Sequence, residues 1–324
     1  MARKRIRLGL IGCGSNMRGA HLPRLARDGA VDIVALADPV VDNAEAIAEE
    51  VGGAPVIETD WRKLLDASLD AVVISTPHDR HFTQVKSFLS SGRHVLIEKP
   101  LTPKPGEARA LLELASRKRR RLVVSYQRHF QPTFVYAREL IRKGEIGRIQ
   151  AASVYVTQNW GAAGGWRLDP RQSGGGMFID TGSHLVAAML WLTGLAPKYV
   201  FSFSDNARHA VDIDTVVSIR FANGALGSLD TIGSASRHDE RIAIHGSRGS
   251  MILDSHQWRG KPLVVNNEAR AIPARIKPDS PDEAFLGYIR GRKGYRRPDY
   301  ALQVANLSHA VYQSARTGKV ARVR

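Results

Sequence analysis

Short apolar runs alternate with helix-length segments through the first 125 residues, and this alternation restricts the fold more than any other feature of the sequence. The runs are rich in β-branched residues, as strands buried on both faces are. They lie at 5–11, 31–37, 55–57, 71–75, 94–97 and 122–125. Segments of helical period separate them, for example 78–91, which ends before Gly92. The pattern predicts a doubly wound parallel sheet over residues 1–125.

The loop after the first strand reads GLIGCGSNMRG and is rich in glycine. Gly12 and Gly14 let the backbone approach a pyrophosphate, and the helix predicted at 20–28 offers it free N–H groups. Met17 stands where the third small residue of a G-x-G-x-x-G motif belongs, so we expect a slightly displaced helix, with Gly19 compensating. A loop of this kind between two strands predicts a dinucleotide-binding Rossmann domain.

The second strand ends at Asp38, 24 residues after Gly14. A carboxylate at this position accepts hydrogen bonds from the ribose hydroxyls and repels a 2′-phosphate. Neither neighbour, Ala37 or Pro39, is an arginine that would accommodate that phosphate. The sequence therefore favours NAD over NADP. The alternative is that Asp38 caps a helix at 41–50, which does not exclude the ribose role.

Two more predicted strands end in residues suited to a binding site. Thr76-Pro77 follows one of them, and Glu98-Lys99-Pro100 follows the next. Because ligands of open parallel sheets bind outside the carboxyl ends of the strands, we expect both segments to face one crevice. Lys99 is the first candidate for chemistry, and a structural lysine paired with a carboxylate is the alternative.

The pattern changes after residue 125, where strands follow one another without intervening helices. The predicted strands are 149–159, 199–204, 213–221, 225–232 and 241–245, and the predicted helices are 131–143, 178–192 and 300–315. These elements indicate an α+β domain over 126–324 with a large, open, mostly antiparallel sheet. We expect 255–282 to be a surface excursion and the last helix to pack back on the first domain.

Composition restricts the class of protein further. Cys13 is the only cysteine, so no internal disulfide can form, and we find neither a signal peptide nor an apolar run of membrane-spanning length. We expect a cytoplasmic protein without a membrane partner. The 47 Lys and Arg exceed the 31 Asp and Glu by 16 charges, with basic runs at 3–7, 117–121 and 290–297. The runs are scattered and no nucleic-acid motif accompanies them, so solvated helix ends and loops are favoured over an anionic substrate or a specific nucleic acid.

Four segments together resemble one known family. They read STPHDRHFTQVKSFLSSGRHVLIEKPLT, YQRHFQPTFVYARELIRKGEIGRI, WRLDPRQSGGGMFIDTGSH and AVYQSARTGKV. In this order they resemble the glucose–fructose oxidoreductase, inositol dehydrogenase and rhizopine-catabolism family, Gfo/Idh/MocA. The resemblance covers essentially the whole chain. It implies an NAD(P)-dependent oxidoreductase whose open sheet buries against a partner subunit, so we expect a homo-oligomer, a dimer or a tetramer.

The resemblance also implies roles for individual residues. Lys99 would lie beside the nicotinamide and the substrate, and the Asp-x-x-x-His motif of the family falls on Asp180 and His184. The cofactor contacts that it implies fall on Gly12, Gly14, Ser15, Asn16, Thr76, Pro77, His81 and Glu98, beside Asp38 and Lys99.

The residues themselves suit the oxidation of a carbinol. Asp180 and His184 are four apart and share one face of a helix, so the histidine can act as a general base while the aspartate binds a hydroxyl or orients the ring. The alternatives are a capping aspartate, a core histidine and, with His209, a zinc site, although we expect no metal. Candidate substrate-binding residues are Arg128, Trp166, Arg167, Asp180 and His184, with His129 and Trp160 as further pocket or scaffold residues.

The predicted function is hydride transfer between a nicotinamide cofactor and a sugar, sugar derivative or cyclic polyol. An NAD-dependent glycoside hydrolase that retains its cofactor is one alternative. A non-catalytic NAD-sensing regulator on the same fold is another, and the combination of Lys99, Asp180 and His184 argues against it.

Overall fold

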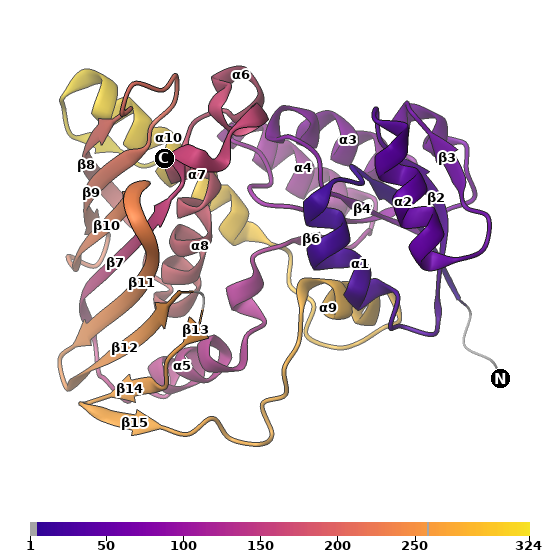
Figure 1. Cartoon of the computed structure of the whole chain (residues 1–324). Helices are drawn as coiled ribbons and strands as arrows, with labels where there is room; N and C mark the ends of the chain where they lie inside the picture. Colours follow the sequence, from indigo (N-terminus) through magenta and orange to yellow (C-terminus); the bar gives the residue numbers. More distant parts are fainter. Residues whose placement is uncertain (1–4, 258) are drawn as a thin grey trace. The chain divides into compact units, whose positions relative to one another are not determined.

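A computed structural model describes residues 5–257 and 259–324, so Arg3 and Lys4 of the first basic run lie outside the described residues. The chain forms two compact units, and each is considered by itself (Figure 1). The first unit contains the described residues up to Leu101 together with Gly106–Ser125 and Ser280–Asp299. The second unit contains Thr102–Pro105, Tyr126–Asp279 and Tyr300–Arg324.

The first unit is built on the predicted parallel sheet. Its six strands run in the order β3-β2-β1-β4-β5-β6, and every neighbouring pair is parallel. They are β1 Ile6–Ile11, β2 Val31–Ala37, β3 Val56–Glu58, β4 Ala71–Ile74, β5 His94–Ile97 and β6 Leu122–Val124. The connecting helices include α2 Val41–Val51, α3 His78–Ser90, α4 Pro105–Arg117 and the 3-10 helix η2 Trp61–Leu65. The doubly wound fold expected from the sequence is confirmed.

The helix after the glycine loop differs from the prediction. A π-helical turn, η1 Met17–His21, precedes a short α1 at Leu22–Leu25, where the sequence predicted one helix over 20–28. The Met17 side chain is fully buried, and the wider π turn provides room for it where a small residue is usual. A Cβ on Gly19 would meet no atom within 4 Å, so Gly19 does not replace the missing small residue in helix–strand packing.

A helix from late in the chain completes the first unit. This helix, α9 at Pro281–Ile289, contacts β5, β6 and α1. The Ser280 side chain caps it, since its Oγ accepts a hydrogen bond from the Glu283 N–H and also lies 2.9 Å from the Glu283 carboxylate. The cap fixes the start of α9, and with it the position of the fully buried Asp282.

The second unit carries a ten-stranded, mostly antiparallel sheet (Figure 1). Its main strands are β7 Ile149–Asn159, β8 Pro197–Asp205, β9 Asp214–Phe221, β10 Leu226–Ile232, β11 Ser234–Gly246, β12 Gly249–His256 and β16 Ala321–Arg322. Only the pairing of β7 with β10 is parallel among the strands of this sheet in the described part of the chain. Helix α8 at Gly182–Thr193 packs against β7, and α5 at Pro132–Arg142 packs against β12 and α8.

Two expectations for the second half are wrong. The stretch 255–282 is not only a surface excursion, because β13 Arg259–Gly260, β14 Leu263–Val265 and β15 Glu268–Arg270 extend the sheet. Leu263 and Val265 are fully buried, which gives this edge its core contacts. The helix predicted at 178–192 is two helices, α7 at Met177–Asp180 and α8, separated at Thr181. The final helix, α10 at Asp299–Thr317, is two residues longer than predicted at its end.

Candidate active site

Gly12 brings the loops that follow β1 and β4 into close contact. It has φ +78°, and a Cβ there would lie 2.4 Å from the carbonyl oxygen of Ser75. Only glycine fits this conformation and this separation together. Asn16, further along the loop, donates its side-chain amide to the Ser75 hydroxyl at 3.0 Å. Both contacts fix the glycine loop at the carboxyl edge of the sheet.

Gly14 faces open space, which distinguishes it from Gly12. A Cβ on Gly14 would meet no protein atom within 4 Å, so the backbone there is accessible to a ligand. This is the space that a pyrophosphate needs beside exposed backbone N–H groups. The exposed Ser15 and Asn16 follow directly. The residues present therefore fit a dinucleotide, which would lie over this loop.

Asp38 ties the end of β2 to the glycine loop. One carboxylate oxygen accepts the Cys13 N–H at 2.7 Å, and the other accepts the Val40 N–H at 2.9 Å and the Asn43 side-chain amide at 3.2 Å. A carboxylate has about four acceptor positions, so capacity for one more donor is left. Cys13 is buried, and burial together with the nearby Asp38 charge raises the pKa of its thiol to about 12. The thiol is therefore a structural group.

His81 connects the loops that follow β4 and β5. Its buried ring lies between the carbonyl oxygens of Thr76 and Pro100, at 2.9 and 2.8 Å from the two ring nitrogens. Burial lowers the pKa of His81, so the neutral ring donates to one of these carbonyls. The Thr76 hydroxyl donates to Gln84 at 2.7 Å, and Pro77 precedes the first residue of α3. Thr76 and Pro77 thus take their positions from α3.

His21, Glu98 and Asp282 form a buried chain of charged groups that contacts the backbone of Lys99. His21 Nε2 is 3.0 Å from Glu98 Oε1, and His21 Nδ1 is 2.6 Å from Asp282 Oδ1. The second Asp282 oxygen lies 3.1 Å from an Arg24 nitrogen, and the second Glu98 oxygen accepts the Lys99 N–H at 3.2 Å. Three elements, η1, β5 and α9, therefore meet through one imidazole ring.

The protonation of this chain follows from its contacts. Burial opposes a charge on His21, but the bonds to Asp282 and Glu98 outweigh it and raise the pKa of the ring to about 10. Burial also opposes ionisation of Glu98, and the His21 bond outweighs it and holds the pKa of the carboxyl far below its usual value. At neutral pH His21 is therefore an imidazolium beside the ionised Glu98 carboxylate. The sequence analysis identified Glu98 but neither His21 nor Asp282, because no local pattern connects residues 261 positions apart.

In the second unit, Asp180 forms the centre of a separate cluster. Its Oδ2 accepts hydrogen bonds from the Trp160 indole at 3.0 Å and from Arg167 Nε at 3.2 Å. The side chain is only 7% exposed, so these donors stabilise a nearly buried carboxylate. The guanidinium of Arg167 also stacks over the ring of Trp166, at 4.6 Å from its centroid. Helix α8 begins at Gly182, and its N-cap residue, Thr181, makes no side-chain cap hydrogen bond.

His184 lies one turn beyond Asp180, among aromatic rings. The Tyr126 ring meets His184 edge-on at 6.0 Å between centroids, and Tyr126 in turn contacts His129 and Tyr300. His129 is buried, stacks on Trp191 and lies 3.2 Å from a backbone carbonyl. Burial lowers the pKa of His129 to about 3, so this ring is neutral scaffold. His184 is partly exposed, whereas His129 is buried.

Two further carboxylates organise the second unit, and the sequence analysis missed both. Glu240 on β11 forms a two-pronged ion pair with Arg128, which engages the Arg128 side chain within the protein. Asp212 accepts the backbone N–H groups of Gly176 at 2.7 Å and Phe178 at 2.9 Å, and so fixes the start of α7. The GGG triplet before α7 was the only local signal, since a Cβ on Gly176 would lie 1.8 Å from the Asp212 carbonyl oxygen.

Neither a metal site nor a membrane-spanning element is found in the described residues. No group of three or more His, Cys, Asp and Glu side chains there is arranged to hold a metal ion. None of the helices in that part of the chain has the length and apolar content that a membrane span requires.

Comparison with known proteins identifies the class and the family of this chain. Residues 6–126 match the family model described as "Oxidoreductase family, NAD-binding Rossmann fold", and residues 134–252 match the "GFO/IDH/MocA C-terminal domain". The fold and the glycine loop thus define an oxidoreductase with an NAD-binding Rossmann domain. The chain belongs to the GFO/IDH/MocA family.

Individual relatives agree with this assignment. The chain is 33% identical over 193 residues to the rhizopine catabolism protein MocA of Rhizobium meliloti, covering 60% of this chain and 59% of that protein. It is 30% identical to inositol 2-dehydrogenase of Rhizobium meliloti (strain 1021), over 78% of this chain and 76% of that one. Among solved structures, GenD2 from gentamicin A biosynthesis in complex with NAD is 26% identical, with a TM-score of 0.85 over 99% of this chain and 97% of that one.

Proposed function

We propose that the chain is an NAD-dependent dehydrogenase of a sugar, sugar derivative or cyclic polyol. The observation that carries the proposal is the nearly buried Asp180 carboxylate, held by Trp160 and Arg167 one helical turn before His184. A carboxylate fixed by an indole and a guanidinium suits recognition of a hydroxyl-rich ligand. The name of the related inositol 2-dehydrogenase supports this class of substrate.

The cofactor preference follows from Asp38. Its carboxylate is held at the end of β2 by Cys13 and Val40, beside the loop where the adenosine ribose would lie. A 2′-phosphate would meet this negative charge, and neither flanking residue is an arginine. We therefore favour NAD over NADP.

The bound nicotinamide would accept or donate the hydride, and the protein would orient the substrate and move one proton. We assign Lys99 to polarising the reacting oxygen, His184 to taking the hydroxyl proton, and Asp180 to binding a neighbouring hydroxyl. Glu98 and His81 act as positioning residues, because their polar atoms contact His21, Thr76 and Pro100.

A substrate screen tests the proposal directly. Purified protein with NAD is offered a panel of free sugars, inositols and glycosides, and absorbance of the reduced cofactor is followed. Stoichiometric NADH from a free polyol is the expected result, with Lys99→Ala lowering turnover at least a hundredfold, about 2.7 kcal/mol of barrier. Exposed Lys86→Ala on α3 is the control and should leave turnover unchanged. Glycoside cleavage without net NADH would indicate the hydrolase instead, and turnover within threefold in Lys99→Ala would refute the lysine assignment.

A further inference from the structure

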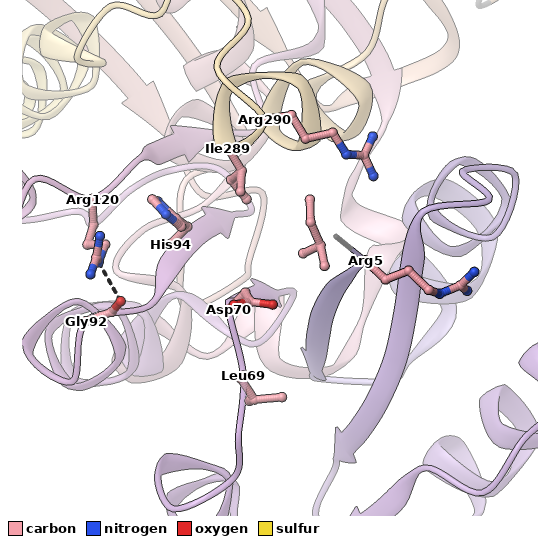
Figure 2. Close-up of a pocket in the computed structure, with 9 residues that line it drawn as sticks. Arg5, Leu69, Asp70, Gly92, His94, Arg120, Ile289 and Arg290 are labelled. Carbon is pink, nitrogen blue, oxygen red and sulfur yellow. Dashed lines mark hydrogen bonds between the residues drawn. The ribbon is translucent and has the colours of Figure 1, made fainter. Parts of the chain in front are cut away.

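Single arginines from three basic runs that are far apart in the sequence line one cavity of the first compact unit. They occupy positions 3–7, 117–121 and 290–297. A cavity of about 460 Å³ is lined by one arginine from each, Arg5, Arg120 and Arg290. Figure 2 shows the three side chains on different sides of one hollow. The runs that look scattered along the sequence are therefore not scattered in the fold.

The cavity lies at the amino edge of the parallel sheet. Its lining includes Ile6 at the start of β1, Asp70 just before β4, and His94 at the start of β5. The glycine loop and Glu98 follow the opposite ends of these strands. Six residues of β1 span about 20 Å at 3.3 Å per residue, so the cavity is separate from the cofactor edge of this unit.

Two of the three arginines are already neutralised by carboxylates. Arg5 pairs with Asp32 at 2.7 Å, and Arg290 holds the two oxygens of Asp28 at 2.6 and 2.9 Å. These two ion pairs are electrically neutral, so the net charge of the cavity depends on its other residues.

Arg120 is different, because its contact is with a carbonyl group. Its Nε donates to the backbone oxygen of Gly92 at 2.5 Å, the bond drawn in Figure 2. Nearby Arg7 and Arg93 also donate to backbone oxygens, and within residues 5–257 and 259–324 none of the three arginines is in an ion pair. The carboxylate of the lining, Asp70, accepts the Arg7 N–H at 3.0 Å. Arg7 and Arg93 do not line the cavity but adjoin its lining residues Ile6, Gly92 and His94 in the sequence, so they add positive charge beside the opposed Arg120 and Asp70.

His94 adds a neutral hydrogen-bond donor to the lining. Its Nδ1 accepts the backbone N–H of Arg121 at 2.8 Å, so the proton of the neutral ring is on Nε2. Burial, and then the charges of Arg120 and Arg121, lower the pKa of His94 to about 4. An anion in the cavity would act in the opposite direction and raise this pKa.

We propose that this cavity binds a small ligand with two or three linked phosphate groups, such as inorganic triphosphate or a nucleoside triphosphate. Guanidinium groups bind phosphate oxygens in paired, charge-assisted hydrogen bonds, and Arg120 has its terminal nitrogens available for them. The volume of about 460 Å³ lies in the usual range of small-molecule sites. A concave site favours a small ligand over a nucleic acid, which needs an extended surface. The ligand and NAD would bind at opposite edges of the sheet and at the same time.

Calorimetric titration in saturating NAD tests the proposal, because the cofactor then occupies its own phosphate-binding loop. Inorganic triphosphate and ATP are titrated separately into wild type, Arg120→Gln and Arg120→Lys. Arg109→Gln is the control, since Arg109 is exposed on α4, eight residues before its end at Arg117. We expect one site per chain, a Kd about tenfold higher in Arg120→Gln, partial retention in Arg120→Lys, and no change in the control. Triphosphate should also raise the pKa of His94, followed by its ring resonances.

The separate titrations with inorganic triphosphate and ATP show which part of the ligand is recognised. Equal affinity for triphosphate and ATP indicates that only phosphate is recognised, and a preference for ATP indicates a base contact. The proposal is overturned by no binding in the presence of NAD, by equal weakening in Arg120→Gln and Arg109→Gln, or by displacement with sulfate at matched ionic strength. Binding of single-stranded RNA without binding of triphosphate would also overturn it. If Arg120→Gln misfolds and loses NAD affinity, the proposal is tested by the Arg120→Lys titration and by the His94 resonances of the wild type. Unchanged triphosphate affinity in Arg120→Lys together with an unchanged His94 pKa would overturn it.

Discussion

Replacing His21 by glutamine removes the cation that lies between two buried carboxylates, while Asp282 keeps its contact with Arg24. Asp282 is 0% exposed and the Glu98 side chain is 12% exposed, so neither can recover full hydration in the variant. The glutamine amide can donate to one carboxylate but carries no charge. We therefore expect His21→Gln to be strongly destabilising, because breaking a buried ion pair from one side leaves uncompensated charge.

The magnitude can be worked from the protonation of the ring. Moving a pKa from 6.5 to about 10 corresponds to about 5 kcal/mol of favourable interaction, at 1.36 kcal/mol per pH unit. Single-partner removal from buried pairs typically costs 3–5 kcal/mol. We expect the free energy of unfolding of the first unit to fall by about 3–5 kcal/mol at pH 7.

The pH dependence gives the prediction its sign. The folded-state pKa of His21 is raised, so its contribution is fully present below pH 6.5 and is lost as pH rises toward about 10. The Glu98 pKa is lowered, so the Glu98 contribution is lost only in strong acid. The difference between wild type and His21→Gln should therefore be largest at about pH 6.5, shrink as pH rises from 6.5 to about 10, and be nearly gone above pH 10.

Hydrogen exchange of peptides from β5 and α9, read by mass spectrometry between pH 6 and 10.5, measures the effect locally. Urea unfolding gives the global value. The matched control is His309→Gln, which changes an exposed histidine of α10 and should alter neither measurement. A loss below 1 kcal/mol at pH 7, or an equal loss at pH 7 and pH 10.5, would refute the account of a buried imidazolium.

Further predictions concern Gly12, Gly14 and Asp38 in the first unit and Asp180 in the second. Gly12→Ala should lower the free energy of unfolding by about 2 kcal/mol or more, because its Cβ would meet the Ser75 carbonyl oxygen at 2.4 Å. Gly14→Ala should leave the free energy of unfolding unchanged, because its Cβ meets no protein atom within 4 Å, but should weaken NAD binding at least tenfold as measured by calorimetry. Asp38→Ser should shift the ratio of kcat/KM for NADP over NAD upward by at least tenfold, about 1.4 kcal/mol, and an unchanged ratio would contradict the charge argument. Asp180→Asn should lower kcat/KM for a polyol at least a hundredfold while NAD affinity stays the same, and a parallel loss of NAD affinity would show that Asp180 acts on the fold.

Much of the first unit could be predicted from local sequence patterns. Apolar runs gave β2 and β5 with their observed ends, because strands buried on both faces have few polar residues to blur the boundary. The helix after the glycine loop could not be placed, because burying Met17 requires a π turn that no helical period encodes. Likewise β14 was missed because three residues are too few to show a period, although Leu263 and Val265 alternate correctly.

In the candidate site, too, residues placed by local spacing could be predicted, and their long-range partners could not. The places of Gly12, Gly14 and Asp38 at the ends of β1 and β2 could be predicted from the spacing of a loop between two strands, and their roles in binding NAD stay a prediction. The partners that hold the site were not. Asp212 grips the start of α7 from 36 positions away, and no sequence pattern relates a strand-flanking aspartate to the N–H groups of a glycine triplet.

The buried chain of His21, Glu98 and Asp282 shows that residues outside every recognisable motif can hold a residue next to the proposed catalytic lysine. Glu98 precedes Lys99, and the backbone N–H of Lys99 donates to the Glu98 carboxylate, so this carboxylate helps to fix the backbone of the proposed catalytic lysine. His21 and Asp282 hold the same carboxylate from η1 and α9. The carboxylate next to Lys99 is thus held by residues from an early and a late segment of the chain, η1 and α9. A change at Asp282 should therefore alter turnover without touching substrate or cofactor, and loss of its charge should affect kcat more than the affinity for NAD.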